Sequence, residues 1–409
     1  MKGTVTRRRR LRSGRTLWQS IPEPALPTMS LRRDIRCDVV IVGAGISGAM
    51  IADRLSEDGF AVAVLDRREP ITGSTMASTA LLQYELDTPL STLARRIGKG
   101  RSERMWRRSK LALDALGERL QGLGLSTCCA RRSSLYLEGD LLDPGALRDE
   151  AMARRQAGFE STYLSRARVE ATYGIRHRAA LLGHGSLEAN PRRLASGFLR
   201  AALNRKTRLY AKADVTMVEP GADGVTIGTR HGPSVSARHV IFATGYEMLR
   251  GIPTKGHRIT STWALSTRPQ PRAAWTDNVL ISEASSPYLY LRVGPGGRIL
   301  CGGEDESDLD DDARDALTPT KIKQIEVKLQ RLLPGIDPRA DYAWSGNFGS
   351  SQTGSPSIGA VPGMRNCYAV LGYGGNGITF SMMAAQLLST ILAGGNDLDA
   401  DLFSFRRRF

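Results

Sequence analysis

The stretch DVVIVGAGISG at residues 38–48 decides the fold of this chain. Its β-branched run is typical of a buried parallel strand, and its glycines have the spacing G-x-G-x-x-G. Residues 49–57 predict a helix that ends at Gly59. A second short strand at residues 61–65 is closed by Asp66. Strand, glycine turn, helix, strand and acid together form a complete βαβ unit of the kind that binds a dinucleotide.

Each glycine of this turn has a physical role. Gly43 permits the tight turn, Gly45 lets the backbone approach a pyrophosphate, and Gly48 lets the helix pack closely on the strand. The helix N-terminus offers unpaired N–H groups and a positive dipole end to phosphates. Asp66 can accept hydrogen bonds from ribose hydroxyl groups. We therefore predict a nucleotide site here; the alternative is a glycine turn that arises by chance.

The pattern of strand, glycine loop and helix returns near the C-terminus, over residues 368–371, 372–377 and 378–392. Between the two ends, short apolar runs within residues 258–303 are separated by turns and favour an antiparallel sheet. We therefore predict an α/β fold, with a Rossmann-like nucleotide-binding domain and an inserted antiparallel-sheet substrate domain. The predicted parts are a basic, flexible N-terminal arm at 1–36, a discontinuous nucleotide-binding domain at 37–120, 185–257 and 343–409, and a substrate-binding domain at 121–184 and 258–342.

The net charge of the 409-residue chain is +16, which at first suggests a nucleic-acid partner. Residues 1–36 contain ten Lys and Arg against Glu23 and Asp34, so +8 of that charge lies in the arm. Charge concentrated near a terminus can be solvated, so we expect no specific nucleic-acid partner. Hydrophobic residues make up 41% of the chain, which excludes a wholly disordered protein.

Targeting and metal-binding signals are weak. The chain has no run of about 18 apolar residues, so no membrane span is expected, and the arm has no apolar stretch of the kind a signal peptide needs. The five cysteines form no C-x-x-C pair and the five histidines have no ligand spacing, so no metal site is predicted. We expect a cytoplasmic protein.

Several motifs, in order from Cys37 to the C-terminal helix, resemble the D-amino-acid oxidase superfamily of FAD-dependent amine oxidoreductases, which includes glycine and sarcosine oxidases. The stretch at residues 78–89 is most similar to the γ-glutamylputrescine oxidase branch. The resemblance implies an FAD-binding domain. The residues it implies for FAD binding are Gly43, Gly45, Ile46, Ser47, Gly48, Asp66, Arg67, Ser74, Thr75, Ser78, Thr79, Ala80, Val215, Ala243, Thr244, Gly245, Gly372, Gly374, Gly375, Asn376, Gly377, Ile378 and Thr379.

Two departures from the superfamily affect the cofactor chemistry. Some relatives attach FAD covalently through Cys or His, but residues 347–350 contain neither, so we expect non-covalent FAD. Some relatives place a lysine near flavin N5 for oxygen activation, and residues 301–303 contain none. The electron acceptor therefore stays open between oxygen and a carrier.

The resemblance implies that an amine or amino acid is oxidised by hydride transfer from the carbon next to nitrogen to flavin N5, giving an imine. The candidate catalytic residues are Gln83, Tyr84, Tyr288, Tyr290 and Arg292. Alternation places the last three on one strand face, where an arginine could bind a substrate carboxylate through two hydrogen bonds. That face could instead be packed or solvated.

Two other functions stay open. The same fold could serve an FAD-dependent dehydrogenase of a hydroxy acid or another non-amine donor. The basic arm also leaves room for a nucleotide-binding or RNA-interacting scaffold without catalysis.

Overall fold

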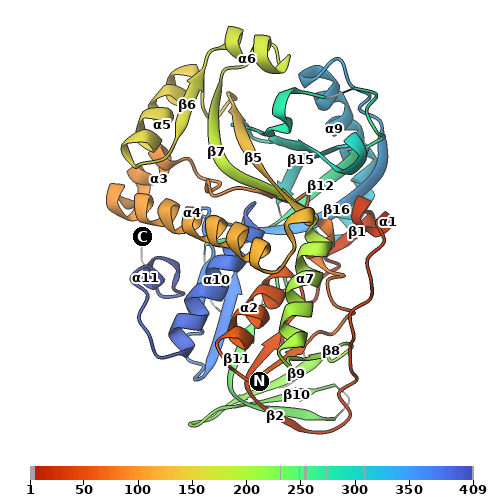
Figure 1. The fold of residues 1–409 in the computed structure, drawn as a ribbon, viewed down its shortest axis with the longest axis vertical. Coiled ribbons are helices and arrows are strands. Elements are labelled where there is room, and N and C mark those ends of the chain that lie inside the picture. Colours follow the sequence, from red (N-terminus) through yellow and green to blue (C-terminus); the bar gives the residue numbers. More distant parts are fainter. Residues whose placement is uncertain are drawn as a thin grey trace.

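The computed structural model describes residues 5–230, 232–247, 249–252, 256–272, 274–307 and 309–407. Two β-sheets form the molecule, the first in the lower half of Figure 1 and the second in the upper half. The first sheet is built around the strand that precedes the glycine motif, and the second is made of the central and N-terminal parts of the chain. Both predicted sheets are therefore present, and the α/β fold class is confirmed.

The first sheet consists mainly of parallel strands. Its order is β17 (Ser357–Ala360), β18 (Cys367–Leu371), β11 (Ser234–Phe242), β2 (Ile35–Val42), β3 (Val62–Leu65) and β8 (Arg208–Tyr210), with β9 (Val215–Pro220) and β10 (Val225–Thr229) as a hairpin joined to β11. β2 pairs in parallel with both β3 and β11. Val39, Val40 and Ile41 are consequently fully buried, which explains the unbroken apolar run.

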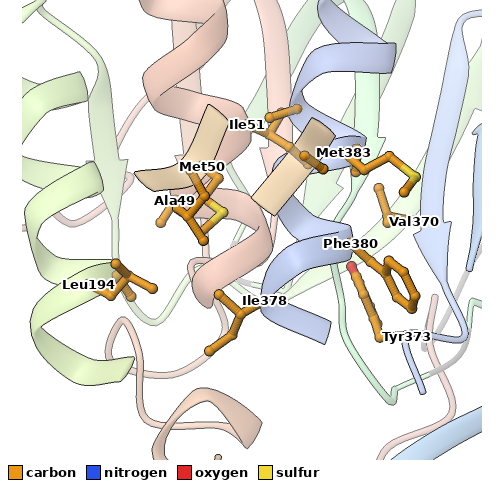
Figure 2. Close-up of a cluster of buried hydrophobic side chains, with 14 of the residues drawn as sticks. Ala49, Met50, Ile51, Leu194, Val370, Tyr373, Ile378, Phe380 and Met383 are labelled. Atoms are coloured by element: carbon orange, nitrogen blue, oxygen red, sulfur yellow. The ribbon is translucent and has the colours of Figure 1, made fainter. Parts of the chain in front are cut away.

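Beside this sheet, α2 (Ile46–Glu57) packs against both α7 (Pro191–Asn204) and α10 (Gly377–Leu392). Figure 2 shows Met50 of α2 between Leu194 of α7 and Ile378 of α10. All three side chains are buried, and complete burial of one such side chain stabilises a fold by about 1.5–3 kcal/mol. The first and last helices of the nucleotide-binding domain therefore share one core, although more than 300 residues separate them.

The second sheet is antiparallel except where β5 pairs with β13. Its order is β1 (Arg12–Arg15), β16 (Ala340–Ser351), β12 (His257–Thr267), β15 (Ile299–Ser307), β14 (Leu289–Val293), β13 (Leu280–Glu283), β5 (Cys129–Leu137), β7 (Ala180–Ala189) and β4 (Leu81–Leu82), with β6 (Ser161–Leu164) also paired to β7. The predicted boundary between residues 342 and 343 is wrong, because it falls inside β16. The boundary between residues 184 and 185 likewise falls inside β7.

Most of the remaining helices cover the second sheet or connect the two halves, and α11 contacts β17 of the first sheet. The long α4 crosses the middle of the molecule in Figure 1 and contacts α10. These elements are α1 (Leu17–Ser20), α3 (Leu90–Ile97), α4 (Lys99–Gly122), α5 (Pro144–Gln156), α6 (Arg166–Tyr173), α8 (Asp311–Ala316), α9 (Thr318–Leu332) and α11 (Ala400–Phe403), with 3₁₀ turns at η1 (Ser74–Ala77), η2 (Ser126–Cys128), η3 (Thr276–Asn278) and η4 (Pro295–Gly297).

The N-terminal arm is packed against the rest of the protein, which corrects the prediction that residues 1–36 are flexible. Residues 1–4 lie outside the described residues. Strand β1 extends the second sheet along β16, and Leu17 and Trp18 of α1 are buried. Few apolar side chains are thus enough to anchor a basic segment when each enters the core and the backbone joins a sheet edge.

Within the described ranges, no helix is both long and apolar enough to cross a membrane. The same residues contain no group of three or more His, Cys, Asp or Glu side chains placed to hold a metal ion.

Gly48→Ala is expected to destabilise the protein by about 1–3 kcal/mol, because overpacking a tight backbone contact forces the elements apart. A Cβ at Gly48 would lie 1.8 Å from the carbonyl oxygen of Gly43. The control is Gly100→Ala in α4, where a Cβ meets nothing within 4 Å. Thermal unfolding should show a lower Tm for the first variant alone; equal Tm values would contradict the expected steric role.

Candidate active site

A cavity of about 570 Å³ lies between the two sheets. The carboxyl ends of β2, β3 and β11 open onto it from one side, and β12, β13, β14 and β16 supply its other wall. In open α/β sheets, ligands bind beyond the carboxyl ends of the parallel strands. The cavity volume is in the range of sites for small molecules and cofactors. This cavity is therefore the candidate active site.

The glycine turn gives the cavity a wall without side chains. Gly43 has a φ of +115°, and a Cβ there would lie 2.3 Å from the carbonyl oxygen of Ala243. Gly45 faces Thr75, whose hydroxyl accepts the N–H of Ile46 at 3.0 Å. Helix α2 begins at Ile46, so its positive dipole end points toward this wall. A phosphate group can approach the backbone here.

A buried hydroxyl also fits a polar ligand. Ser74 Oγ is buried, its residue lines the cavity, and it has no hydrogen-bond partner within the described residues. Buried polar groups in proteins are normally paired, so an unpaired one beside a cavity fits a ligand that completes the bond. The residues around the glycine turn thus fit a dinucleotide cofactor.

Asp66 lies at the end of β3 and lines the cavity. Its two carboxylate oxygens accept the N–H groups of Ala44 at 2.7 Å and Arg68 at 2.8 Å. Burial raises the pKa of Asp66, and these two backbone hydrogen bonds act in the opposite direction. The carboxylate is therefore fixed in place, with lone pairs left for ribose hydroxyl groups. Arg67 also lines the cavity, but its guanidinium pairs with Glu247.

The C-terminal glycine loop is tied to the segment that follows β4. Gly375 donates its N–H to Asp87 at 2.9 Å, and Asn376 donates its side-chain amide to the carbonyl of Glu85 at 2.6 Å. Thr379 donates its hydroxyl to the carbonyl of Gln83 at 2.9 Å. The two side chains expected to meet the flavin therefore brace the loop, while the N-terminal turn of α10 lines the cavity.

Most of the predicted cofactor residues line the cavity, with two exceptions. Gly48 packs against Gly43, as described above. Gly372 lies outside the lining, and a Cβ there would meet His257 at 2.3 Å, so this glycine accommodates an imidazole ring. The lining residues are Gly43, Gly45, Ile46, Ser47, Asp66, Arg67, Ser74, Thr75, Ser78, Thr79, Ala80, Val215, Ala243, Thr244, Gly245, Gly374, Gly375, Asn376, Gly377, Ile378 and Thr379.

The opposite end of the cavity is aromatic. Gln83, Tyr288 and Tyr290 line it as predicted. The two tyrosine rings lie 5.7 Å apart between centroids, and Tyr290 crosses Gly302, where a Cβ would lie 2.4 Å from the tyrosine hydroxyl. Burial raises the pKa of Tyr290, so its hydroxyl stays protonated at neutral pH and can donate a hydrogen bond. Tyr246 also lines the cavity, and its ring lies 6.2 Å from that of Tyr373 between centroids.

Three carboxylates at this end were missed by the sequence analysis: Glu85, Asp87 and Glu283. Glu85 accepts from Ser134 at 2.9 Å through one oxygen, while its other oxygen is buried without a partner among the described residues. Glu283 accepts the N–H of Leu289 at 3.0 Å. No motif marks these acids: Glu85 and Asp87 lie in the loop after β4, and Glu283 is the last residue of β13.

Arg154 is the arginine that lines this end of the cavity in the part of the chain that the structure describes. It donates to Glu150 at 2.8 Å and lies 4.0 Å from Glu85, and its guanidinium stacks over Trp106. Its charge is therefore already compensated. This end of the cavity carries more carboxylate than cationic charge.

Tyr84 is a wrong prediction for a catalytic residue. Its side chain is 2% exposed and packs against Trp106 and Phe159, with ring centroids 6.3 and 5.6 Å away. It is absent from the cavity lining. Gln83 and Glu85 on either side of it line the cavity, whereas the Tyr84 side chain turns into the core, where burial raises its pKa.

Arg292 is also wrongly assigned, because it does not reach the cavity. It is 2% exposed and donates to the backbone carbonyls of Thr79 at 2.7 Å and Ala189 at 2.8 Å. Burial lowers its pKa to about 10, and Glu188 acts in the opposite direction. The face shared with Tyr288 and Tyr290 was predicted correctly, but the strand carries Arg292 behind the cavity wall.

The geometry defines a class: a protein that binds a dinucleotide cofactor in a cavity between a Rossmann-like sheet and a second, mostly antiparallel sheet. The family model "FAD dependent oxidoreductase" matches residues 38–391. The chain therefore belongs to this family, and its cofactor is FAD.

Comparison with individual proteins supports the same fold and family. The chain is 25% identical to gamma-glutamylputrescine oxidoreductase of Escherichia coli (strain K12) over 389 residues, covering 92% of this chain and 87% of that protein. Glycine oxidase from Geobacillus kaustophilus superposes with a TM-score of 0.73 at 18% identity, covering 91% and 99% of the two chains. L-proline dehydrogenase from P. horikoshii gives a TM-score of 0.75 at 18% identity, covering 93% and 98%.

Tyr290→Phe is expected to lower kcat/KM roughly tenfold, because it removes a hydroxyl donor from the cavity wall. Tyr84→Phe makes the same chemical change in the core and should leave kcat/KM within about twofold of the wild-type value. Steady-state kinetics on both variants tests the revised assignment. A loss in Tyr84→Phe as large as that in Tyr290→Phe would contradict the revised assignment and return Tyr84 to the catalytic candidates.

Proposed function

We propose that this protein catalyses the FAD-dependent oxidation of a cationic amine in the cavity between the two sheets. The observation that carries the proposal is the polarity of the cavity: a glycine turn suited to phosphates at one end and tyrosines with carboxylates at the other. The gamma-glutamylputrescine oxidoreductase relative acts, by its name, on an amine of this kind.

The charge of the substrate end favours an amine over an anionic donor. Glu85, Asp87 and Glu283 face this end, and Arg154 is shared between Glu150 and Glu85. A hydroxy acid would bring another carboxylate into this field, and like charges in a poorly solvated site repel strongly. An ammonium group would compensate buried carboxylates that lack a full set of cations.

The side chains at this end position the substrate. The hydroxyl of Tyr290 can donate to a substrate heteroatom, and the tyrosine rings enclose an alkyl chain and exclude water. Bound FAD supplies a two-electron acceptor for the hydride that leaves the carbon next to nitrogen. The substrate also loses a proton from nitrogen and becomes an imine, which water later hydrolyses. The protein's contribution is position and electrostatics.

Attachment of FAD is proposed to be non-covalent. In the described part of the chain, neither a cysteine nor a histidine lines the cavity. The same lining contains no lysine, so a lysine-assisted reaction with oxygen has no support at this site, and the acceptor is oxygen or a carrier. A cytoplasmic location stays a prediction.

The first test is anaerobic reduction of the purified holoenzyme. Amines of increasing length, amino acids and hydroxy acids are added separately, and flavin absorbance is followed. We expect amines to bleach the flavin at least tenfold faster than hydroxy acids of equal length. Reduction by hydroxy acids in preference to amines would support the alternative dehydrogenase. A flavin that no donor reduces would contradict the proposed function.

Asp87 should give substrate binding a pH dependence. Its residue is exposed to the cavity, and desolvation by the protein atoms around it raises its pKa to about 6, although the N–H of Gly375 acts in the opposite direction. The group is neutral below about pH 6 and negative above it, so affinity for an ammonium substrate should rise as pH increases through 6. Asp87→Asn should remove this limb from the pH profile of KM. An unchanged limb in the variant would assign it to another group.

A further inference from the structure

The N-terminal arm crosses one end of the cavity, at Asp66 and Val215. We call this the adenosine end, because Asp66 is the expected partner of the ribose hydroxyl groups. At its start, Val5 accepts the N–H of Arg250 at 2.8 Å and Thr6 forms a β-bridge with Leu249, which fixes the arm to the first domain. Residues 12–15 then pair with β16 of the second sheet, beside which β1 and α1 are seen in Figure 1. The arm therefore connects both walls of the cavity.

Three arm residues are part of the cavity lining: Val5, Thr6 and Leu11. Leu11 is 8% exposed and contacts Gly73, where a Cβ would lie 3.0 Å from the leucine methyl. Gly73 directly precedes the segment at residues 74–80, which lines the cavity opposite the glycine turn. The arm thus lies against the loop that encloses the cofactor.

That loop is held by three side chains from distant parts of the chain. Trp344 donates its indole N–H to the carbonyl of Ala77 at 2.8 Å, Trp18 donates to Ser78 at 2.7 Å, and Arg292 donates to Thr79 at 2.7 Å. Three consecutive carbonyls are therefore fixed, one by Trp344 of the cavity lining and two by Trp18 and Arg292, which lie outside that lining. The next residue, Ala80, has a φ of +55°, a conformation that a non-glycine residue adopts only when its surroundings enforce it.

Trp18 is itself firmly placed. It is fully buried, and the guanidinium of Arg292 stacks over its ring at 5.6 Å. Arg192 donates to the carbonyls of Trp18 at 3.2 Å and Ile21 at 2.9 Å. A buried cation over an aromatic face is a favourable contact. Trp18 and Arg292 therefore act as a unit on the loop.

The arm's charges are compensated within the protein. Arg8 pairs with Asp214, and Arg10 pairs with Asp315 at 2.7 Å and with Asp312 at 3.0 Å. The N–H of Arg9 donates to Glu247 at 3.0 Å. Asp214 and Glu247 line the cavity, whereas Asp312 and Asp315 belong to α8. The basic character predicted to be solvated serves here to attach the arm.

We propose that residues 5–20 form a cofactor strap, which closes the adenosine end of the FAD site and, through Trp18 as a positioning residue, holds the loop at residues 77–80 against the cofactor. Release of FAD then requires the strap to detach or the loop to loosen. Loss of the strap's contacts should raise the rate of FAD release. The accompanying loss of apoprotein stability, measured as a lower Tm, should be small. The proposal rests on the FAD site and not on the identity of the substrate.

The test compares Trp18→Phe with Trp275→Phe in the full-length holoenzyme. Trp275 is 5% exposed and donates its indole N–H to the carbonyl of Val279 at 2.9 Å, away from the cavity lining. Both substitutions remove one buried indole hydrogen bond and keep an aromatic ring. FAD release after dilution is followed by flavin fluorescence, FAD affinity by titration of apoprotein, and apoprotein stability by thermal unfolding.

We expect Trp18→Phe to release FAD roughly threefold to tenfold faster than the wild type, the range that one hydrogen bond represents. Trp275→Phe should release FAD at the wild-type rate. A wild-type rate in Trp18→Phe, or the same acceleration in both variants, would overturn the proposal.

A second pair of variants decides the matter if Trp18→Phe does not fold. Arg8→Ala/Arg10→Ala removes the arm's ion pairs at exposed positions, and Arg32→Ala/Arg33→Ala changes the net charge equally at exposed positions outside the strap. We expect the first pair to accelerate FAD release roughly twofold to fivefold at low salt, with the difference shrinking at high salt. Equal release rates from the two double variants would refute the strap.

Discussion

The closest approach in the first sheet joins backbone atoms where no side chain fits: a Cβ on Gly43 would meet the carbonyl of Ala243 at 2.3 Å, and one on Gly48 would meet the carbonyl of Gly43 at 1.8 Å. Because Gly43 and Gly48 have no Cβ atoms, the backbones of β2, β11 and the start of α2 can approach one another closely. The N-terminus of α2 is thereby aimed at the cavity, and α10 packs on α2 with its own N-terminus at the same place. A single methyl group would separate the elements that together form the cofactor wall.

The two ends of the cavity differ in how far their charged side chains are paired. Near the adenosine end, arginines and acids pair within the protein, as Arg67 and Arg68 do with Glu247. At the substrate end, Asp87 forms no ion pair within the described residues, and Glu85 has only Arg154 at 4.0 Å, a cation that also pairs with Glu150. Desolvation by the surrounding protein raises the pKa of Asp87, which is the direction expected of a carboxylate without a cation. Unpaired buried carboxylates are unfavourable in the free protein, and a cationic ligand that compensates them gains that energy on binding.

The sequence correctly predicted the features that depend on backbone conformation. It did not predict the positions of side chains that depend on tertiary contacts. The glycines at residues 43–48 have strict steric roles, so their spacing located the cofactor wall. Tyr84 and Arg292 were misplaced, because alternation gives a strand face but not how far the cavity extends along it. Asp87 could not be found, because its role depends on a glycine loop almost 300 residues away. Trp18 was missed since its indole meets Ser78 only after both sheets have formed.

The cofactor wall is assembled from both ends of the chain, which has a consequence for biosynthesis. β2 ends at residue 42, but its neighbour β11 ends at residue 242, and β18 and α10 follow only after residue 366. The glycine turn can bond to β3 early, but the strap and the rest of the cofactor wall must wait for most of the chain to leave the ribosome. Proteins with such long-range contacts fold slowly and expose aggregation-prone strands meanwhile. The last fifty residues, rather than the first, determine when this enzyme can acquire its flavin.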